Sequence, residues 1–382
     1  MLNSSSVLRL NFCTKLNFCA SISATTPIPE TLAVMARTTL TIKVYDMKLI
    51  ITFILGLITT ASLAQAKKAL PTLDMHMHAL PADFDGPPPV GMCSPFEHWY
   101  VKDAKESGMD YMINVVSRNL YCNGKGFMSP STDDSIMTET IKVMEKYNIY
   151  GVTSGAYPMV QKWKSASSKR VIPALMFSPE MNIPIETLRK WFTSDSIKVF
   201  GELVGQYNGI TLSDSIMEPY LALAEELDVP INVHVGPGPP GIAYAGAKNY
   251  RAKLHSALVI EEALLKHPKL RVMVAHAGWP MIDDMLAVLY AHPQVYVDLG
   301  IICYGFPKKE FYGYLERLVN AGFGKRICFG SDQMIWPQTI VAGIETINKA
   351  TFLTESQKRD ILYNNAARFL RLTEDEIKKH HQ

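Results

Sequence analysis

Four histidines and one aspartate are the residues of this chain that could together hold a metal ion. His76 and His78 stand two positions apart in the apolar run "PTLDMHMHAL". Because side chains alternate along a strand, both imidazoles would point to one face, while Met75 and Met77 point to the other. A His-x-His pair is weak evidence by itself, since two hydrogen-bonded structural histidines would give the same pattern. The metal interpretation therefore depends on partners elsewhere in the chain.

Those partners follow other apolar runs. His234 ends the run "INVH", His276 follows "VMVA", and Asp332 lies in "CFGSDQ". Each stands at the carboxyl end of a predicted strand, which is the face where barrel enzymes build their active sites. Neutral imidazoles and a carboxylate suit a borderline divalent ion, most simply Zn²⁺, with one position left for water. Such an ion lowers the pKa of its water to about 7, so the pattern predicts metal-activated attack by water.

Eight short apolar runs predict the strands that would position these residues. They cover residues 73–78, 149–154, 171–177, 197–204, 231–235, 270–276, 295–299 and 327–331. Segments with helical spacing stand between them, around residues 137–144, 216–223, 282–289, 311–318 and 340–347, and Thr354 with Gln357 predicts a capping box that opens a last helix to about residue 370. Continuous apolar strands alternating with helices predict a single-domain (β/α)8 TIM barrel over residues 70–372, with an open doubly wound sheet as the competing architecture.

A long insertion, residues 81–133, follows the first strand. Within it, residues 111–116 also resemble a strand, and Cys93 and Cys122 could either pair or remain free thiols. Long loops in compact domains are usually functional lids or flexible segments. At the other end of the chain, residues 373–382 are predicted to form a polar tail.

The segment before the barrel predicts export. Residues 47–66 have the parts of a secretory signal peptide: Lys48, an apolar run over 49–63, and the small-x-small site at 64–66. The run is shorter than the ~20 apolar residues of a membrane-spanning helix, so no stable membrane anchor is expected. Residues 1–46 are interpreted as a mis-annotated extension before a true start at Met47, with an organellar transit peptide as the alternative. A periplasmic location follows from the signal peptide.

The amino-acid composition excludes few functional classes, but its charge balance argues against a nucleic-acid partner. The chain has 382 residues, 48% of them hydrophobic, with 38 Lys and Arg against 36 Asp and Glu. This near balance of charge gives no electrostatic reason for nucleic-acid binding. A small-molecule substrate is expected instead, and a homodimer is left open.

The spacing of the five residues resembles the amidohydrolase superfamily. The stretches "AHAGWP", "FGSDQMIWP" and "YNNAARFLRL" are similar to its amidohydrolase-related branch, which includes aminocarboxymuconate-semialdehyde decarboxylase, over residues 73–372. The resemblance implies a metal held by four residues, His76, His78, His234 and Asp332. It also implies that Asp332 moves a proton from water to the leaving group, and that His276 polarises the scissile carbonyl or steadies the oxyanion.

One position departs from a common version of that pattern. Many two-metal members carry a lysine at the end of the fourth strand, where this chain has Glu202 in "KVFGELVG". Glutamate can ligate or bridge a metal, so a second ion is open; alternatively, it orients a ligand histidine. Glu202 is predicted to lie within reach of the metal.

Three further residues are predicted to bind substrate. The loop after the fifth strand presents Tyr250 and Arg251 near the barrel mouth, and Trp336 follows the Asp332 motif. Arg251 could hold a substrate carboxylate, although an arbitrary loop arginine is more often a solvated surface charge. A large aromatic such as Trp336 is likewise often simply part of the core.

These observations predict a metal-dependent hydrolase that cleaves an amide, lactone or ester bond of a small molecule through metal-activated water. The same family pattern also allows a metal-dependent, non-oxidative decarboxylase. A non-catalytic metal-binding barrel is the alternative from another class. Retention of both His276 and Asp332 argues against it, because the fold alone requires neither residue.

Overall fold

The computed structural model describes residues 8–13, 19–24, 69–96, 99–117 and 126–382, in two compact units, Met1–Lys68 and Ala69–Gln382. In the first unit, β1 (Leu8–Cys13) pairs antiparallel with β2 (Cys19–Ala24). The predicted signal peptide, residues 47–66, and most of the extension before it lie outside the described residues. Among the residues that are described, no helix combines the length and apolar character needed to cross a membrane.

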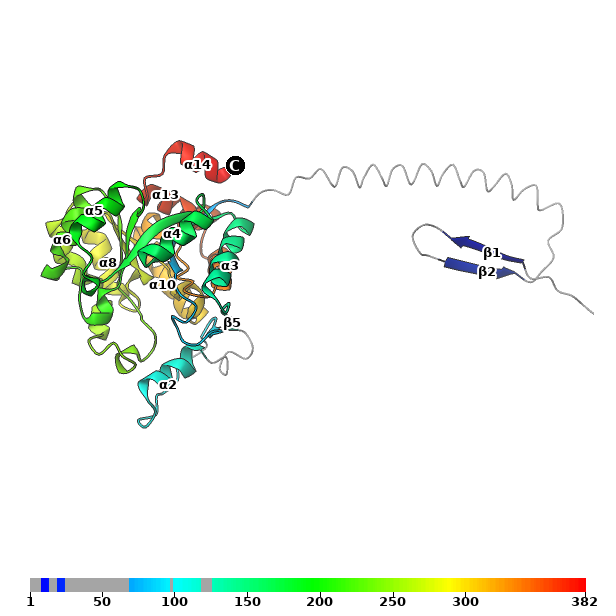
Figure 1. The fold of residues 1–382 in the computed structure, drawn as a ribbon, viewed down its shortest axis with the longest axis horizontal. Helices are drawn as coiled ribbons and strands as arrows, with labels where there is room; N and C mark the ends of the chain where they lie inside the picture. The colour runs from blue at the N-terminus through cyan, green and yellow to red at the C-terminus, as the bar shows by residue number, and fades with distance from the viewer. Residues whose placement is uncertain (1–7, 14–18, 25–68, 97–98, 118–125) are drawn as a thin grey trace, which may run out of the picture. The chain divides into compact units, whose positions relative to one another are not determined.

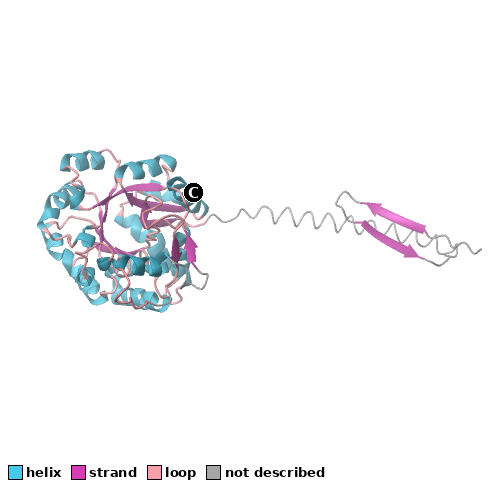
Figure 2. Cartoon of the chain, turned by 60° about the horizontal axis from the view of Figure 1, so that its bottom comes forward, coloured by secondary structure: helices cyan, strands magenta, loops and turns pink. Residues whose placement is uncertain are grey.

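The second unit is built on one parallel sheet of eight strands, in the order β12-β11-β10-β9-β8-β7-β6-β3. The strands are β3 (Thr72–Ala79), β6 (Ile149–Gly155), β7 (Val171–Phe177), β8 (Val199–Leu203), β9 (Ile231–His234), β10 (Val272–Ala275), β11 (Val295–Asp298) and β12 (Ile327–Cys328). The two outer strands meet, because the amide of Met75 in β3 donates to the carbonyl of Phe329 just after β12, at 2.9 Å. The strands form a nearly closed ring inside a layer of helices (Figure 2). The predicted TIM barrel and its eight strands are confirmed.

Helices, most of them amphipathic, surround the barrel (Figure 1). They are α3 (Asp133–Lys146), α4 (Tyr157–Ala166), α5 (Ile185–Thr193), α6 (Glu218–Glu226), α7 (Glu261–Lys266), α8 (Ile282–Ala291), α9 (Ile302–Gly305), α10 (Lys308–Leu318), α11 (Gln338–Lys349), α12 (Glu355–Arg359) and α13 (Asn365–Phe369). Most predicted apolar faces pack inward; Phe311, Leu315 and Leu318 of α10, for example, are buried. Ile216 is an exception at 50% exposed, because it precedes α6 in a short turn rather than lying on the buried face of the helix.

Short 3-10 and π-helical turns connect these elements. They are η3 (Pro179–Met181), η4 (Gly205–Asn208), η5 (Ser215–Met217), η6 (Ile242–Tyr244), η7 (Ala252–His255), η8 (Ala257–Ile260), η9 (His276–Gly278), η10 (Val319–Phe323), η11 (Gly324–Arg326) and η12 (Asp360–Asn364). Four of them, η6 to η9, lie in the segments that follow β9 and β10. These segments form part of the barrel mouth.

The insertion after β3 carries its own small elements. β4 (Gly91–Cys93) pairs antiparallel with β5 (Gly126–Met128), and α2 (Gly108–Met112) continues into the π-helical turn η1 (Ile113–Ser117). The strand suggested for residues 111–116 is therefore wrong. Ser107 starts a helix there, since its side chain accepts a hydrogen bond from the amide of Asp110. Cys93 is disulfide-bonded, whereas its predicted partner, Cys122, lies outside the described residues.

The C-terminal end of the chain is helical. The predicted capping box of Thr354 and Gln357 is present at α12. A second box, formed by Thr373 and Glu376, opens α14 (Glu374–His381) where a polar tail was expected. In α14, His380 stacks on Tyr150 with ring centroids 3.6 Å apart. In Figure 1, α13 and α14 lie at one end of the barrel and α2 lies at the other.

Candidate metal centre and active site

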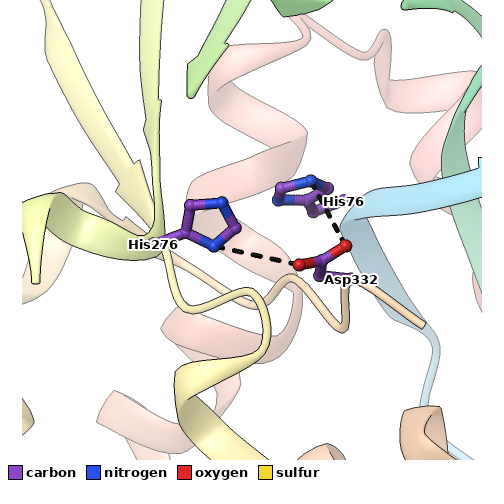
Figure 3. A group of neighbouring side chains, drawn as sticks. All are labelled: His76, His276 and Asp332. Atoms are coloured by element: carbon purple, nitrogen blue, oxygen red, sulfur yellow. Dashed lines mark ion pairs between the residues drawn. The ribbon is translucent and has the colours of Figure 1, made fainter. Parts of the chain in front are cut away.

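The predicted residues converge at the carboxyl ends of the strands. His76 and His78 lie on β3, both 2% exposed, with ring centroids 5.1 Å apart. Asp332 faces them from the segment after β12: its Oδ1 lies 3.1 Å from His78 Nε2 and 3.8 Å from His76 Nε2. His276, just after β10, places Nδ1 4.0 Å from Asp332 Oδ2 (Figure 3). Residues from three distant segments thus surround one small volume.

Glu202 and His234 complete the cluster. Glu202 is the next-to-last residue of β8, and its Oε1 lies 2.6 Å from His234 Nδ1. The same oxygen is 3.3 Å from His276 Nε2 and 3.5 Å from His76 Nε2. Glu202 therefore lies among the histidines, and it also orients His234 through a hydrogen bond. Both roles considered for this residue are compatible with its position.

Three of the imidazoles have their Nδ1 atoms engaged by the protein. His76 Nδ1 lies 3.2 Å from Asp298 Oδ1, His234 Nδ1 bonds Glu202, and His276 Nδ1 lies 3.0 Å from the carbonyl oxygen of Gly300. Because all three partners are acceptors, they favour the tautomer that carries the proton on Nδ1. The lone pairs of His76 Nε2 and His234 Nε2, which have no partner among the described residues, are then free for a metal. Metal-ligating histidines are oriented in this way.

The atoms that would hold a metal have no hydrogen-bond partner among the described residues. They are Nε2 of His76, Nε2 of His78, Nε2 of His234 and Oδ1 of Asp332, and all four are buried. The 3.1 Å approach of His78 to Asp332 is an ion-pair distance without hydrogen-bond geometry. Buried polar atoms without partners are rare in proteins, and three nitrogens with one carboxylate oxygen form a donor set typical of zinc. These side chains therefore fit a divalent cation.

Proximity divides the candidate donors into overlapping groups. Within each group the donor atoms lie within 4.8 Å of one another, and the groups are His76–His276–Asp332, His76–His78–Glu202 and Glu202–His234–His276. His276 therefore lies with the candidate ligands, and it is only 1% exposed. Its predicted contact with a substrate carbonyl stays a prediction.

Two glycines make room for His76. A Cβ atom at Gly300 would lie 2.7 Å from His76 Nδ1, and one at Gly330 would lie 2.8 Å from His76 Cβ. Both distances are shorter than a normal van der Waals contact. The imidazole can therefore reach Asp298 only because the chain after β11 and β12 lacks side chains at these two positions.

His276 and Asp332 have unusual backbone conformations. Their φ angles are 56° and 52°, in the left-handed region, which costs a residue with a side chain about 1–2 kcal/mol. Hydrogen bonds hold both conformations: the Asp332 amide donates to the His76 carbonyl at 2.6 Å, and the His276 amide donates to Asp298 Oδ1 at 3.2 Å. Conformations of this kind concentrate at functional sites.

The carboxylates and imidazoles of the cluster shift one another's pKa values. Burial raises the pKa of Glu202, but the charges of His76 and His234 outweigh burial, so its pKa lies well below the ordinary value. Burial likewise raises the pKa of Asp332, and His76 and His78 bring it below the ordinary value. For His76, burial lowers the pKa, but Asp298 and Glu202 raise it well above the usual range. Both carboxylates are therefore anionic at neutral pH, and a metal would have to displace a proton from His76.

A large cavity of about 1360 Å³ opens onto the cluster. His78, Glu202, His234 and Asp332 contribute to its wall. Most of the remaining lining side chains are apolar or aromatic and come from the insertion after β3 and from the loop after β9. The metal candidates thus lie where a bound small molecule would reach them.

The three predicted substrate-binding residues all line this cavity. Arg251 is exposed, and its Nη1 donates to the carbonyls of Lys248 and Tyr250 at 2.7 and 2.8 Å. The Tyr250 hydroxyl lies 2.6 Å from His255 Nε2. Trp336 is 2% exposed and donates from Nε1 to the Val90 carbonyl at 2.8 Å. Their positions suit substrate contact, and their roles stay predictions.

The sequence interpretation missed three residues. Asp298 ends β11 and orients His76, and the strand-end criterion that selected Asp332 could have found it. Asp85, in the insertion, has an unpartnered buried Oδ2 on the cavity wall; burial and then the charge of Asp332 raise its pKa to about 7. The Tyr207 ring lies 4.9 Å from that of His234. Nothing in the local sequence of Asp85 or Tyr207 indicates these positions.

Comparison with known proteins agrees with this geometry. The family model described as Amidohydrolase matches residues 73–372. The chain belongs to the amidohydrolase family. No curated protein matches this amidohydrolase.

Solved structures show the same fold at low sequence identity. An uncharacterised TIM-barrel protein from Bordetella bronchiseptica has a TM-score of 0.52 and 15% identity, with 81% of this chain and 100% of that chain covered. A probable 2-pyrone-4,6-dicarboxylic acid hydrolase from Acinetobacter baumannii has a TM-score of 0.51 and 12% identity, covering 79% and 100%. A putative amidohydrolase from Staphylococcus aureus has a TM-score of 0.51 and 15% identity, covering 79% and 100%. These similarities support the barrel fold of the amidohydrolase.

Proposed function

We propose that this amidohydrolase is an exported, zinc-dependent hydrolase that cleaves an amide, lactone or ester bond of a small molecule. The observation that carries the proposal is the set of four buried donor atoms without protein partners, on His76, His78, His234 and Asp332. Three of these residues, His78, His234 and Asp332, line a cavity large enough for a substrate. The signal-peptide interpretation of residues 47–66 supports a periplasmic location, and the near balance of charge supports a small-molecule substrate rather than a nucleic acid.

When bound, a divalent cation supplies Lewis acidity and makes water nucleophilic near neutral pH. Hydrolysis adds the oxygen of water to the carbonyl carbon, breaks the bond from that carbon to nitrogen or oxygen, and transfers the protons of water to the products. Asp332 suits the proton transfer, because its carboxylate is anionic and lies on the cavity wall. It would accept a proton from water and return it to the leaving atom.

His276 and Glu202 set the electrostatics around that carboxylate. Burial lowers the pKa of His276, but its hydrogen bond to Glu202, together with the charges of Asp332 and Glu202, raises the pKa above the ordinary value. A protonated imidazole beside the reacting carbonyl would stabilise negative charge that develops on its oxygen. Glu202 holds His234 in the tautomer that a metal requires.

The test uses the purified chain from Lys67 onward, loaded with zinc and incubated with a mixture of carboxylated lactones and amides. Ring opening or free amine without carbon dioxide is the expected result. Release of carbon dioxide would contradict the hydrolase and establish the decarboxylase. Replacing Asp332 with Asn provides the control for a non-catalytic barrel: zinc retention with loss of turnover indicates an enzyme, whereas unchanged behaviour in every assay indicates a binding protein.

A further inference from the structure

We propose that the substrate of this site carries a long aliphatic chain, an acyl or alkyl group, that fills the cavity beside the metal candidates. The inference rests on the proposed function, because it places the reactive bond at the cluster of histidines. It goes further by naming the part of the substrate that the rest of the cavity binds.

The lining of the cavity is the first argument. Five methionines line it, Met92, Met109, Met112, Met176 and Met334, and aromatic side chains such as those of Phe96, Trp99 and Phe306 lie between them. Methionine is unbranched and adapts its shape to a partner, so a surface rich in methionine suits a flexible apolar chain. Burying methylene groups against such a wall is favourable, and a polar group would lose its water there without replacement.

The positions of the positive charges are the second argument. Among the described lining residues, Lys248 and Arg251 are the only lysine and arginine, and both are exposed. Arg251 already donates to two backbone carbonyls. His255 is neutral near pH 7, because burial lowers its pKa to about 4. A small polyanion inside the cavity would therefore lack buried cationic side chains beyond the histidine cluster, and it would face Asp85 and Glu202 instead.

The size of the cavity is the third argument. Its volume of about 1360 Å³ exceeds the roughly 300–1,000 Å³ of ordinary ligand pockets. The insertion after β3 and the loop after β9, which supply most of its lining, also contact each other: Gly108 of α2 packs directly against the Tyr244 backbone of η6, and a Cβ at Gly241 would lie 2.9 Å from the Tyr111 ring. The two segments thus form one continuous wall along the apolar space.

Chain-length dependence of binding tests the inference without requiring turnover. Butanoate, octanoate and dodecanoate share one carboxylate head, so contact of that head with the zinc-loaded protein cancels across the series. Isothermal titration calorimetry of the full chain is expected to show Kd falling about two- to fourfold per added methylene. Equal Kd values for the three acids would overturn the proposal.

Two matched variants test where the aliphatic chain of the ligand binds. Met109 and Met181 are both 46% exposed, but only Met109 lines the cavity. Met109→Asp is expected to weaken dodecanoate binding about tenfold more than butanoate binding, because the carboxylate opposes apolar contact. Met181→Asp should leave the series unchanged, and equal effects of both variants would contradict the assigned cavity.

Failure of this inference is distinguishable from failure of the proposed function. A steep chain-length series with no hydrolysis of an N-dodecanoyl amide, a dodecanoate ester or any lactone would contradict the hydrolase while supporting the chain-binding cavity. Equal Kd values across the series, together with hydrolysis of a short lactone, would support the hydrolase and contradict the chain-binding cavity.

Discussion

Replacing Asp298 with asparagine is expected to weaken zinc binding about 10- to 100-fold, although Asp298 is not among the predicted ligands. This residue is 0% exposed, and its Oδ1 accepts hydrogen bonds from His76 Nδ1 at 3.2 Å, the His276 amide at 3.2 Å and the Gly300 amide at 2.9 Å. Its Oδ2 accepts from Asn232 Nδ2 at 3.1 Å. The carboxylate therefore fixes the ring orientation and tautomer of His76, and it also holds the backbone of His276.

The magnitude follows from counting acceptors. An asparagine amide offers one oxygen, so either His76 or Asn232 would face an NH2 group and lose its partner. An unsatisfied buried donor costs about 1–3 kcal/mol, which sets the expected loss of unfolding free energy. Even with the oxygen toward His76, a neutral acceptor replaces a charged one, and charge-assisted hydrogen bonds are about twice as strong. The expected 10- to 100-fold loss of zinc affinity corresponds to about 1.4–2.7 kcal/mol.

Competition with a chromophoric chelator measures zinc affinity, and denaturant unfolding of the metal-free protein measures stability. Asp74→Asn is the matched control, because Asp74 is also 0% exposed but bonds the amides of His76 and Ser331 rather than an imidazole. It should change zinc affinity less than tenfold. The reasoning is refuted if Asp298→Asn binds zinc like the unchanged protein, or if both variants lose affinity equally.

Four other changes have defined outcomes. Asp332→Asn should keep zinc within about tenfold by metal analysis yet lower kcat at least ~10²-fold, and undiminished turnover would contradict its role in proton transfer. Gly300→Ala should reduce zinc affinity, because the added methyl group would displace the His76 ring. Its control is Gly313→Ala, at an exposed helix position where a methyl group meets no neighbour, which should raise the free energy of unfolding by about 0.5–1 kcal/mol. Zinc binding at pH 7 should release protons, because His76 has a raised pKa and must lose its proton to bind the metal. Equal binding enthalpies in buffers of different ionisation enthalpy would contradict proton release. Burial lowers the pKa of His380 to about 4 from 6.5, so its contribution is present above pH 6.5 and lost as the pH falls toward 4. Because this side chain is partly exposed, the free energy of unfolding should differ between the two pH values by only about 1 kcal/mol. The difference should be absent in His380→Gln.

Local sequence was sufficient to predict the barrel. Apolar runs of strand length alternate with helical spacing, and that alternation requires a covered parallel sheet, so all eight strands could be located. The same pattern was misleading at residues 111–116, where Ser107 caps a helix and Gly108 packs against Tyr244 of the loop after β9. Long-range packing overrides weak local preference in such an insertion.

The sequence by itself determined which side chains could meet, because a residue at the end of a parallel strand must lie at one face of the barrel. It identified His76, His78, His234 and Asp332 in this way. Only the tertiary structure decided that Asp298 holds His76 and Glu202 holds His234 by Nδ1, and that two segments far apart in the chain line one apolar cavity beside them. The position of each strand follows from the periodicity of its own residues. Hydrogen-bond partners and cavity walls depend instead on residues that only folding brings together.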